Sequence, residues 1–281
     1  MTGTHMATQT APNRADHIDG TPDYRRWLGL IVILSAMLGF IAAPWPLGMK
    51  AHAVLHGLCA QTPSHTLRLG GQMLPFDARM TGIYAGVAMA MIAIGFRTRF
   101  RFAGIPRWPL LAVLATLVVL MAVDGFNSFF LDMGVWHAYT PQNWLRLLTG
   151  MGAGIALGAT LSYLIASTLW QDTSFRKAAA SWRDLAVTFT ACAGAAALFL
   201  SGWGFLYVIV TFALVATAIF VICTIALLML ILLRESNNRW RSVGDMQLEG
   251  AIGILLGLLV VAMLAGGRFA LEYWLGIPAL A

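Results

Sequence analysis

The sequence predicts an all-α membrane protein: a polytopic bundle of about seven transmembrane helices, with a cytoplasmic N-terminus and an outside C-terminus. Hydrophobic residues make up 59% of the 281 residues and charged residues only 11%, whereas about a quarter of a soluble domain is charged. Mean hydropathy is +0.76. Long apolar runs with almost no charge indicate membrane-spanning helices, and basic residues that recur in alternate loops indicate the orientation.

The N-terminal 23 residues differ from the rest of the chain. Residues 1–23 are rich in Thr, Asp, Asn and Pro and contain no apolar segment, which predicts a disordered cytoplasmic tail and no cleavable signal peptide. The second residue is Thr2, which argues against N-myristoylation. Residues 24–281 are expected to form a single membrane domain with one extracytoplasmic polar loop, 47–80.

Seven apolar segments fit spans of about 20 residues. The second segment is short unless it begins before Thr81, and the run 185–233 is too long for one helix, so we place a break at the Ser-Gly-Trp-Gly of 201–204. The predicted spans are 27–46, 81–96, 108–130, 144–170, 185–203, 205–233 and 249–271.

Lys and Arg residues fall mainly on one side of this arrangement. The tail and the loops after the second, fourth and sixth spans contain Arg14, Arg25, Arg26, Arg97, Arg99, Arg101, Arg107, Arg176, Lys177, Arg183, Arg234, Arg239 and Arg241. The other side has Lys50, Arg68, Arg79, Arg146 and Arg268. The positive-inside rule therefore places the tail in the cytoplasm, in a multi-pass protein of the cytoplasmic membrane.

The formal charge of +6 reflects this topology. No basic cluster is interleaved with aromatic residues as a nucleic-acid groove requires. The expected partners are the lipid bilayer and other membrane subunits, and no nucleic acid is expected.

The polar loop 47–80, which we call the island, gathers reactive residue types. His52, His56 and Cys59 are spaced i, i+4, i+7, so a helix through them would present all three on one face. With His65 or Asp77 they could ligate a divalent metal such as zinc or copper. The alternative is that these histidines are interfacial polar groups. Gly70-Gly71 predicts a hairpin-like bend within the island.

Polar residues inside the spans point to the same outer side. Asp124 and Asn127 share one face of the third span, and Arg146 lies near the start of the fourth. Asp124 and Arg146 form either a structural ion pair between adjacent helices or part of a site. In such a site Arg79 and Arg146 would hold an anion, with Asp124 or a histidine as base.

Two further patterns concern packing. Arg268 and Glu272 are spaced i, i+4 and predict an ion pair on one helix. Glycines repeat every four residues in two spans, which predicts seams where helices pack closely: Gly150, Gly154 and Gly158, and Gly253 and Gly257.

Two segments, LCAQTPSHTLRLGGQMLPFDARMTGIYAG at 58–86 and VDGFNSFFLDMGVWHAYTPQNWLRLLTGMGAG at 123–154, resemble the domain of unknown function 2085 family of prokaryotic multi-pass membrane proteins. The resemblance covers residues 50–160 and implies no activity. It singles out Cys59, Pro63, Arg79, Thr81, Gly82, Tyr84, Asp124, Gly125, Asn143, Arg146, Thr149 and Gly150.

The chain departs from that family where the family has its other cysteines and a histidine. This chain has Ala60 where the family has a His after its first cysteine, and Asp77-Ala78-Arg79-Met80 where the family has Cys-Ala-Arg-Cys. A thiolate-rich metal site or a disulfide is therefore not expected. We infer independently that nearby histidines could replace the missing ligands.

These observations favour an integral membrane protein with an outward-facing polar site for a metal or for an anionic or lipid-headgroup ligand. Its ligand-binding candidates are Arg79, Tyr84, Asp124, Asn127, Asn143 and Arg146. The alternative is a non-catalytic membrane subunit or assembly factor of a larger complex; a transporter ranks lowest. No P-loop, G-x-G-x-x-G, H-E-x-x-H or G-x-S-x-G motif is present, so no enzyme class is assigned.

Overall fold

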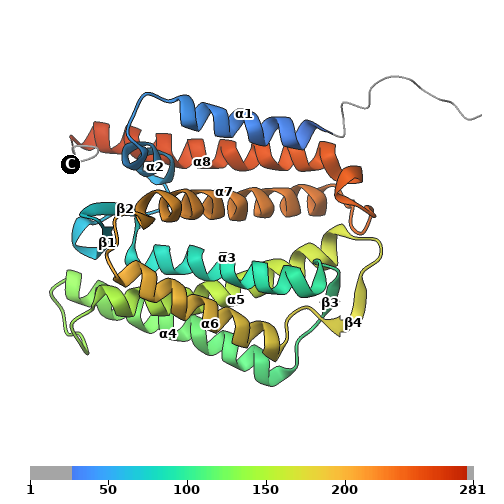
Figure 1. The fold of residues 1–281 in the computed structure, drawn as a ribbon, viewed down its shortest axis with the longest axis horizontal. Helices are drawn as coiled ribbons and strands as arrows, with labels where there is room; N and C mark the ends of the chain where they lie inside the picture. The colour runs from blue at the N-terminus through green and yellow to red at the C-terminus, as the bar shows by residue number, and fades with distance from the viewer. Residues whose placement is uncertain (1–26, 277–281) are drawn as a thin grey trace, which may run out of the picture.

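The structure, a computed structural model, describes residues 27–276. Residues 1–26 and 277–281 lie outside the described residues, and so does the predicted disordered tail with Arg14, Arg25 and Arg26. Within the described part, long helices run side by side in one bundle (Figure 1), which confirms the predicted all-α membrane architecture.

The described helices are α1 (Leu28–Ala42), α2 (Leu47–Leu55), α3 (Ala78–Thr98), α4 (Trp108–Asp132), α5 (Asn143–Leu169), α6 (Trp182–Leu200), α7 (Leu206–Leu233) and α8 (Gln247–Leu275). Two short 3₁₀ turns are η2 (Pro63–His65) and η3 (Val243–Met246). Of the described helices, α3 to α8 are long and apolar enough to cross a membrane, and α1 is a shorter apolar helix. Each predicted span corresponds to one of these seven helices.

Two helix boundaries follow from local chemistry. The second span begins at Ala78 because the Asp77 carboxylate caps α3, accepting a hydrogen bond from the Met80 amide at 2.8 Å. The predicted break at 201–204 is confirmed, since α6 ends at Leu200 and Gly202 adopts a left-handed φ of 71°.

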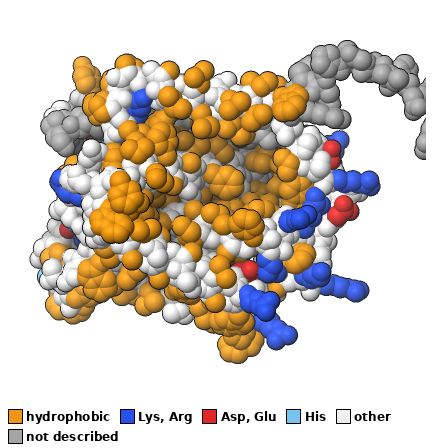
Figure 2. All heavy atoms as spheres, in the orientation of Figure 1, with side chains coloured by type: hydrophobic (Ala, Val, Ile, Leu, Met, Phe, Trp, Pro, Cys, Tyr) orange, Lys and Arg blue, Asp and Glu red, His pale blue; other side chains and the backbone are white. Residues whose placement is uncertain are grey.

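Small strands mark the two ends of the bundle. In the island, β1 (Thr66–Leu69) pairs antiparallel with β2 (Gln72–Asp77) across the Gly70-Gly71 turn, which confirms the predicted bend. At the opposite end β3 (Phe102–Gly104) pairs in parallel with β4 (Ser174–Ala178). Lys and Arg gather at that end, and the surface between the ends is mainly hydrophobic (Figure 2). We call the two ends the island end and the arginine-rich end.

The seam between α3 and α5 is the closest helix contact in the bundle core. A methyl group on Gly150 would overlap the Arg79 carbonyl oxygen, and one on Gly154 would overlap that of Ile83. Gly82 meets the Leu147 carbonyl in the same way. Small residues allow the two backbones to touch, as the sequence predicted for α5.

The glycines of α8 form a second predicted seam. A Cβ on Gly253 would lie 2.7 Å from the Leu227 Cβ, and one on Gly257 would lie 2.6 Å from the Cys223 Cα, both on α7. These seams hold α8 against α7 and α5 against α3.

Substitution Gly154→Ala should lower the free energy of unfolding by about 1–3 kcal/mol, the usual cost of overpacking, because the obstructing atoms belong to the α3 backbone. The matched control is Gly194→Ala on α6, where a Cβ meets nothing within 4 Å. Thermal unfolding of the purified protein in detergent measures both variants. Equal midpoints for the two would contradict the close seam.

Candidate functional site

The Asp124 carboxylate is the centre of a polar cluster at the island end. Arg79 Nη2 donates to its Oδ2 at 2.6 Å, and the Tyr139 hydroxyl donates to its Oδ1 at 2.8 Å. Thr149 Oγ1 lies 3.4 Å from Oδ2. Asp124 is only 1% exposed, and these hydrogen bonds compensate for the water that its buried carboxylate has lost.

Of the two alternatives for Asp124 and Arg146, the direct ion pair does not form, because the Asp124 carboxylate pairs with Arg79 instead. Arg79 stands in the first turn of α3, and the α3–α5 seam brings that turn up to α4. The same guanidinium also donates to Ser128 Oγ at 3.0 Å. Spacing along the chain could not reveal this partner, since it depends on how three helices pack.

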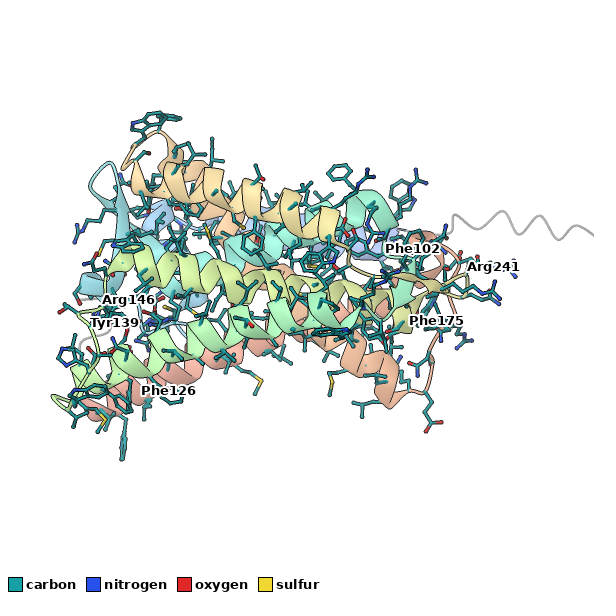
Figure 3. All side chains as sticks on the ribbon, turned by 90° about the horizontal axis from the view of Figure 1, so that it is seen from below. Phe102, Phe126, Tyr139, Arg146, Phe175 and Arg241 are labelled. Carbon is teal, nitrogen blue, oxygen red and sulfur yellow. The ribbon has the colours of Figure 1, made fainter. Side chains whose placement is uncertain are left out.

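Arg146 is left with one neutral partner. Its Nη1 donates to Asn143 Oδ1 at 3.1 Å, although the residue is only 5% exposed. In residues 27–276 no carboxylate oxygen lies within 4.0 Å of the Arg146 guanidinium. Figure 3 shows Arg146 and Tyr139 near each other at the island end.

The N-terminus of α5 adds to the positive potential beside Arg146. Gln142 is its N-cap and makes no side-chain capping bond, and the first turn contains no acidic residue. The free N–H groups of a helix start attract anions. In addition, the Arg79 Nε is buried with no hydrogen-bond partner among the described residues.

Two asparagines hold the loops around this cluster. Asn127 donates to the Tyr139 carbonyl at 2.8 Å and accepts from the Ala138 amide at 2.7 Å. Asn143 donates to the Ser64 carbonyl of the island at 3.1 Å. Tyr139 is thus fixed over Asp124, and partial burial together with the hydrogen bond to Asp124 raises the pKa of Tyr139 to about 12. The phenol is therefore a neutral donor at neutral pH.

A second cluster fastens the island to α8. The predicted pair Arg268–Glu272 is confirmed, with Nε and Oε1 at 2.7 Å. Glu272 Oε2 also lies 2.7 Å from His56 Nε2, and the His56 ring stacks on Phe269 at 4.2 Å. Arg268 donates further to the carbonyls of His56 and Cys59. These contacts explain why the island is ordered.

The expected helical face of His52, His56 and Cys59 does not form. Helix α2 ends at Leu55 with His56 as its C-cap, so Cys59 lies beyond the helix. After Leu55 the chain continues in tighter turns, since the His56 amide donates to the Ala53 carbonyl and the Leu58 amide to the Leu55 carbonyl at 2.9 Å. Arg268 of α8 then takes the carbonyls of His56 and Cys59, so these groups need no helical partner.

Cys59 faces Asp77. Its thiol donates to Asp77 Oδ2 at 3.3 Å, and the Gln61 and Asp77 amides point at the sulfur. Burial, with the nearby Asp77 charge, raises the pKa of the Cys59 thiol from 9.0 to about 11. Position 77, where the resembling family has a cysteine, therefore contacts Cys59, but in this chain the contact is made by a carboxylate.

The proposed metal ligands are spread over separate contacts. Cys59 pairs with Asp77, while His56 is held by Glu272 and by Gln61 at 3.1 Å. Burial lowers the pKa of both His52 and His65. Among residues 27–276 no three His, Cys, Asp or Glu side chains gather closely enough to hold a metal ion.

Tyr84 belongs to the Cys59 side of the island, away from the Asp124 cluster. It is buried and stacks on Phe76 at 4.8 Å. Three contributing residues were not predicted: Ser128, Tyr139 and Gln61. Ser128 stands one turn after Asp124 and could have been found by its spacing. Tyr139 and Gln61 lie in loops, and only tertiary contacts reveal them.

The fold and the polar clusters define a polytopic α-helical membrane protein with two clusters of polar and charged residues at its island end. A family model described as "Predicted membrane protein (DUF2085)" matches residues 59–160. An uncharacterized protein of Methanocaldococcus jannaschii is 31% identical over 124 residues, which cover 43% of this chain and 73% of that protein. The chain belongs to the DUF2085 family. No solved structure matches it.

Replacing Asp124 by Asn should lower the free energy of unfolding by about 3 kcal/mol, because it leaves the Arg79 charge without its buried partner. The control is Asp172→Asn, whose side chain is 68% exposed and 4.0 Å from Arg101, and which should change stability by less than about 1 kcal/mol. Unfolding in detergent with rising denaturant measures both. A stability loss for Asp124→Asn no larger than the control's would contradict the central role of Asp124.

The Cys59 thiol should react slowly with maleimide at neutral pH, because its raised pKa leaves little thiolate. The unfolded thiol ionises near pH 9 and the folded thiol near pH 11, so its contribution to stability is present below pH 9 and lost as pH rises to 11. Labelling rates in a Cys192→Ala, Cys223→Ala background test this, with SDS-unfolded protein as reference. Equal folded and unfolded rates would refute it.

Proposed function

We propose that this protein, in the cytoplasmic membrane of a prokaryote, binds a phosphate-type anion at Arg146 on its outward-facing island end. The observation that carries the proposal is the Arg146 guanidinium itself. It is 5% exposed, yet its one side-chain hydrogen bond goes to the neutral Asn143 amide. Buried arginines are normally paired with an acid, so a bound anion would complete the missing interaction.

The neighbouring groups favour a negative ligand at this point. Both Asp124 oxygens are already used by Arg79, Tyr139 and Thr149. The uncapped N-terminus of α5 adds its free amides to the positive field of Arg146. A guanidinium also presents paired N–H donors that match two oxygens of a phosphate or carboxylate.

Three acids oppose this field without forming an ion pair with Arg146. Asp124, Asp132 and Asp77 all interact electrostatically with it, and Asp124 is already paired with Arg79. Asp77 is occupied as the α3 cap, and Asp132 is exposed at the end of α4. Their negative charges lower the affinity of the site for an anion. Neutralising Asp132 should therefore strengthen anion binding.

Two sources offer this chemistry at a membrane surface: a phospholipid headgroup and free phosphate. Titration of the purified protein with inorganic phosphate, followed by calorimetry, tests the free anion. Capture of the protein in nanodiscs with or without phosphatidylglycerol, followed by thermal unfolding, tests the headgroup. Stabilisation by the lipid but not by phosphate would identify a headgroup ligand.

Arg146→Gln should weaken phosphate binding at least tenfold, the loss expected when a charge-assisted pair is removed. Asp132→Asn should strengthen it about two- to fivefold. The control is Arg68→Gln, which removes an exposed island arginine bonded to the Gly71 carbonyl at 3.3 Å. Unchanged binding by Arg146→Gln, in either the phosphate or the lipid experiment, would refute the site.

The alternative, a subunit or assembly factor of a larger complex, is supported by α4. Most residues of α4 are not buried, and the helix presents an aromatic outer face that includes Phe126 (Figure 3). We rank it second because lipid contact alone accounts for such a face. The hypothesis of a metal site is supported only by the types of residue in the island.

A further inference from the structure

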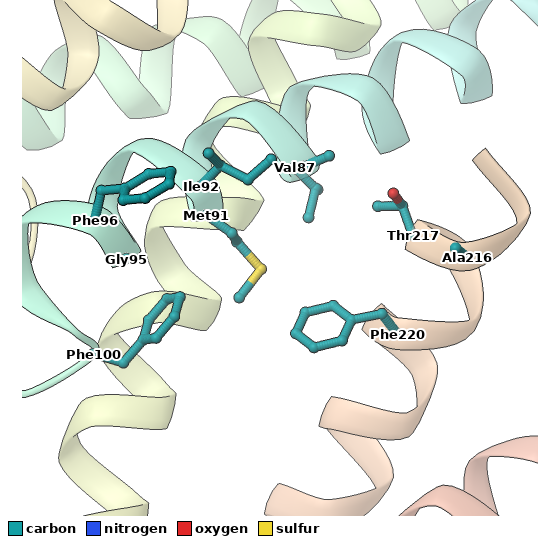
Figure 4. A pocket seen from close by; sticks show the side chains of 10 residues that line it. Val87, Met91, Ile92, Gly95, Phe96, Phe100, Ala216, Thr217 and Phe220 are labelled. Carbon is teal, nitrogen blue, oxygen red and sulfur yellow. The ribbon is translucent and has the colours of Figure 1, made fainter. Parts of the chain in front are cut away.

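An apolar groove of about 550 Å³ opens between α3 and α7. It appears in Figure 2 as a hollow lined by hydrophobic side chains, and Figure 4 shows it from close by. Met91, Gly95 and Phe100 line one wall, and Ala216 and Phe220 of α7 line the other. The polar cluster at the island end lies outside this groove.

The groove covers one half of the bilayer. It begins at Val87, near the middle of α3, and continues to Phe96 and Phe100 at the arginine-rich end. The twelve residues of α3 from Val87 to Thr98 rise about 16 Å, roughly half of the ~30 Å hydrocarbon core. A spanning helix of another protein, or of a second copy, would need a matching face across the whole core. An acyl chain of one leaflet needs only this length.

The turn after α3 shapes the end of the groove. Arg99 and Phe100 both adopt left-handed backbone angles, with φ of 49° and 56°, which non-glycine residues rarely do. The turn brings the Phe100 ring back across Gly95, where a Cβ would lie 2.7 Å from the Phe100 Cζ. The Phe100 amide donates to Thr98 Oγ1 at 3.0 Å and holds this turn.

The same turn contains a basic residue, Arg99, directly before Phe100, which lines the groove. Arg97 is bound to Asp184 at 2.7 Å, and Arg101 donates to the Arg241 carbonyl. Arg99 is exposed, and in the described part of the chain no carboxylate lies within 4.0 Å of it. The apolar groove therefore ends at Phe100, and the residue before Phe100 is an exposed arginine without a carboxylate partner among the described residues.

We propose that this groove holds one acyl chain of an anionic phospholipid from the leaflet on the arginine-rich side, with the lipid phosphate at Arg99. The apolar walls receive the chain, and Arg99 selects the charged headgroup. The positive-inside rule assigns this leaflet to the cytoplasmic face. The site is separate from the proposed anion site at Arg146, which lies at the opposite end.

Native mass spectrometry of the full-length protein in mild detergent tests the proposal, with phosphatidylglycerol and phosphatidylcholine of identical acyl chains as probes. Ala216→Trp should fill the groove and reduce retention of both lipids about tenfold, a loss of apolar contact. Arg99→Gln should reduce only the preference for phosphatidylglycerol, about fivefold. That preference should also fall as salt rises.

The controls match each change at a site away from the groove. Val119→Trp adds the same side chain to the exposed face of α4, and Arg239→Gln removes another exposed basic residue; both should bind lipid like the parent. Retention by Ala216→Trp equal to that of Val119→Trp would overturn the proposal. The proposal would also be overturned if the parent protein were a dimer and Ala216→Trp made it a monomer, because the groove would then be an interface between two copies.

A second measurement uses the unmodified protein, in case Ala216→Trp does not fold. Phosphatidylglycerol with a photoreactive diazirine in its acyl chain should label peptides that contain Met91 or Phe220. Labelling confined to α4, whose exposed apolar face samples bulk lipid, would overturn the proposal. Excess unlabelled phosphatidylglycerol should suppress groove labelling more than phosphatidylcholine does.

Discussion

Direct backbone contact between α3 and α5 is the constraint on which the island end depends. Gly150 and Gly154 allow the α5 backbone to lie against the carbonyls of Arg79 and Ile83. This contact brings the α3 turn that contains Arg79 against the α5 turns that follow Arg146. Of the two arginines, Arg79 pairs with Asp124 at 2.6 Å, and among the described residues no carboxylate oxygen lies within 4.0 Å of the Arg146 guanidinium. The glycine seam thus helps to set the positions of both arginines at the island end.

The second cluster has a different task. Arg268 and Glu272 form an ion pair on α8, and both side chains also bind the island, through His56 and through the carbonyls of the following residues. The clamp depends on Gly57 as well, because a Cβ at that position would overlap the α8 backbone at Leu264. It orders the segment whose 3₁₀ turn then receives Asn143 from α5. The island thus connects α8 with the cluster around Asp124.

The Cys59–Asp77 contact explains one difference between this chain and the family motif, which has a cysteine at position 77. Positions that are cysteines in the resembling motif lie 3.3 Å apart here as a thiol and a carboxylate. Asp77 keeps a structural task, since its other oxygen caps α3. A carboxylate can cap a helix and accept the thiol proton at once. In this chain the pair therefore forms a neutral thiol beside an acid, without thiolate chemistry at neutral pH.

The sequence by itself determined the spans and their order, because hydropathy acts locally along the chain; the distribution of Lys and Arg predicts their orientation. It also determined the glycine seams, the Gly70-Gly71 hairpin and the Arg268–Glu272 pair, all of which follow from spacing within one element. Only the tertiary structure decided that Asp124 pairs with Arg79, that α2 ends before Cys59, and that a groove opens between α3 and α7. These features depend on distances between helices far apart in sequence, which periodicity along one helix does not contain.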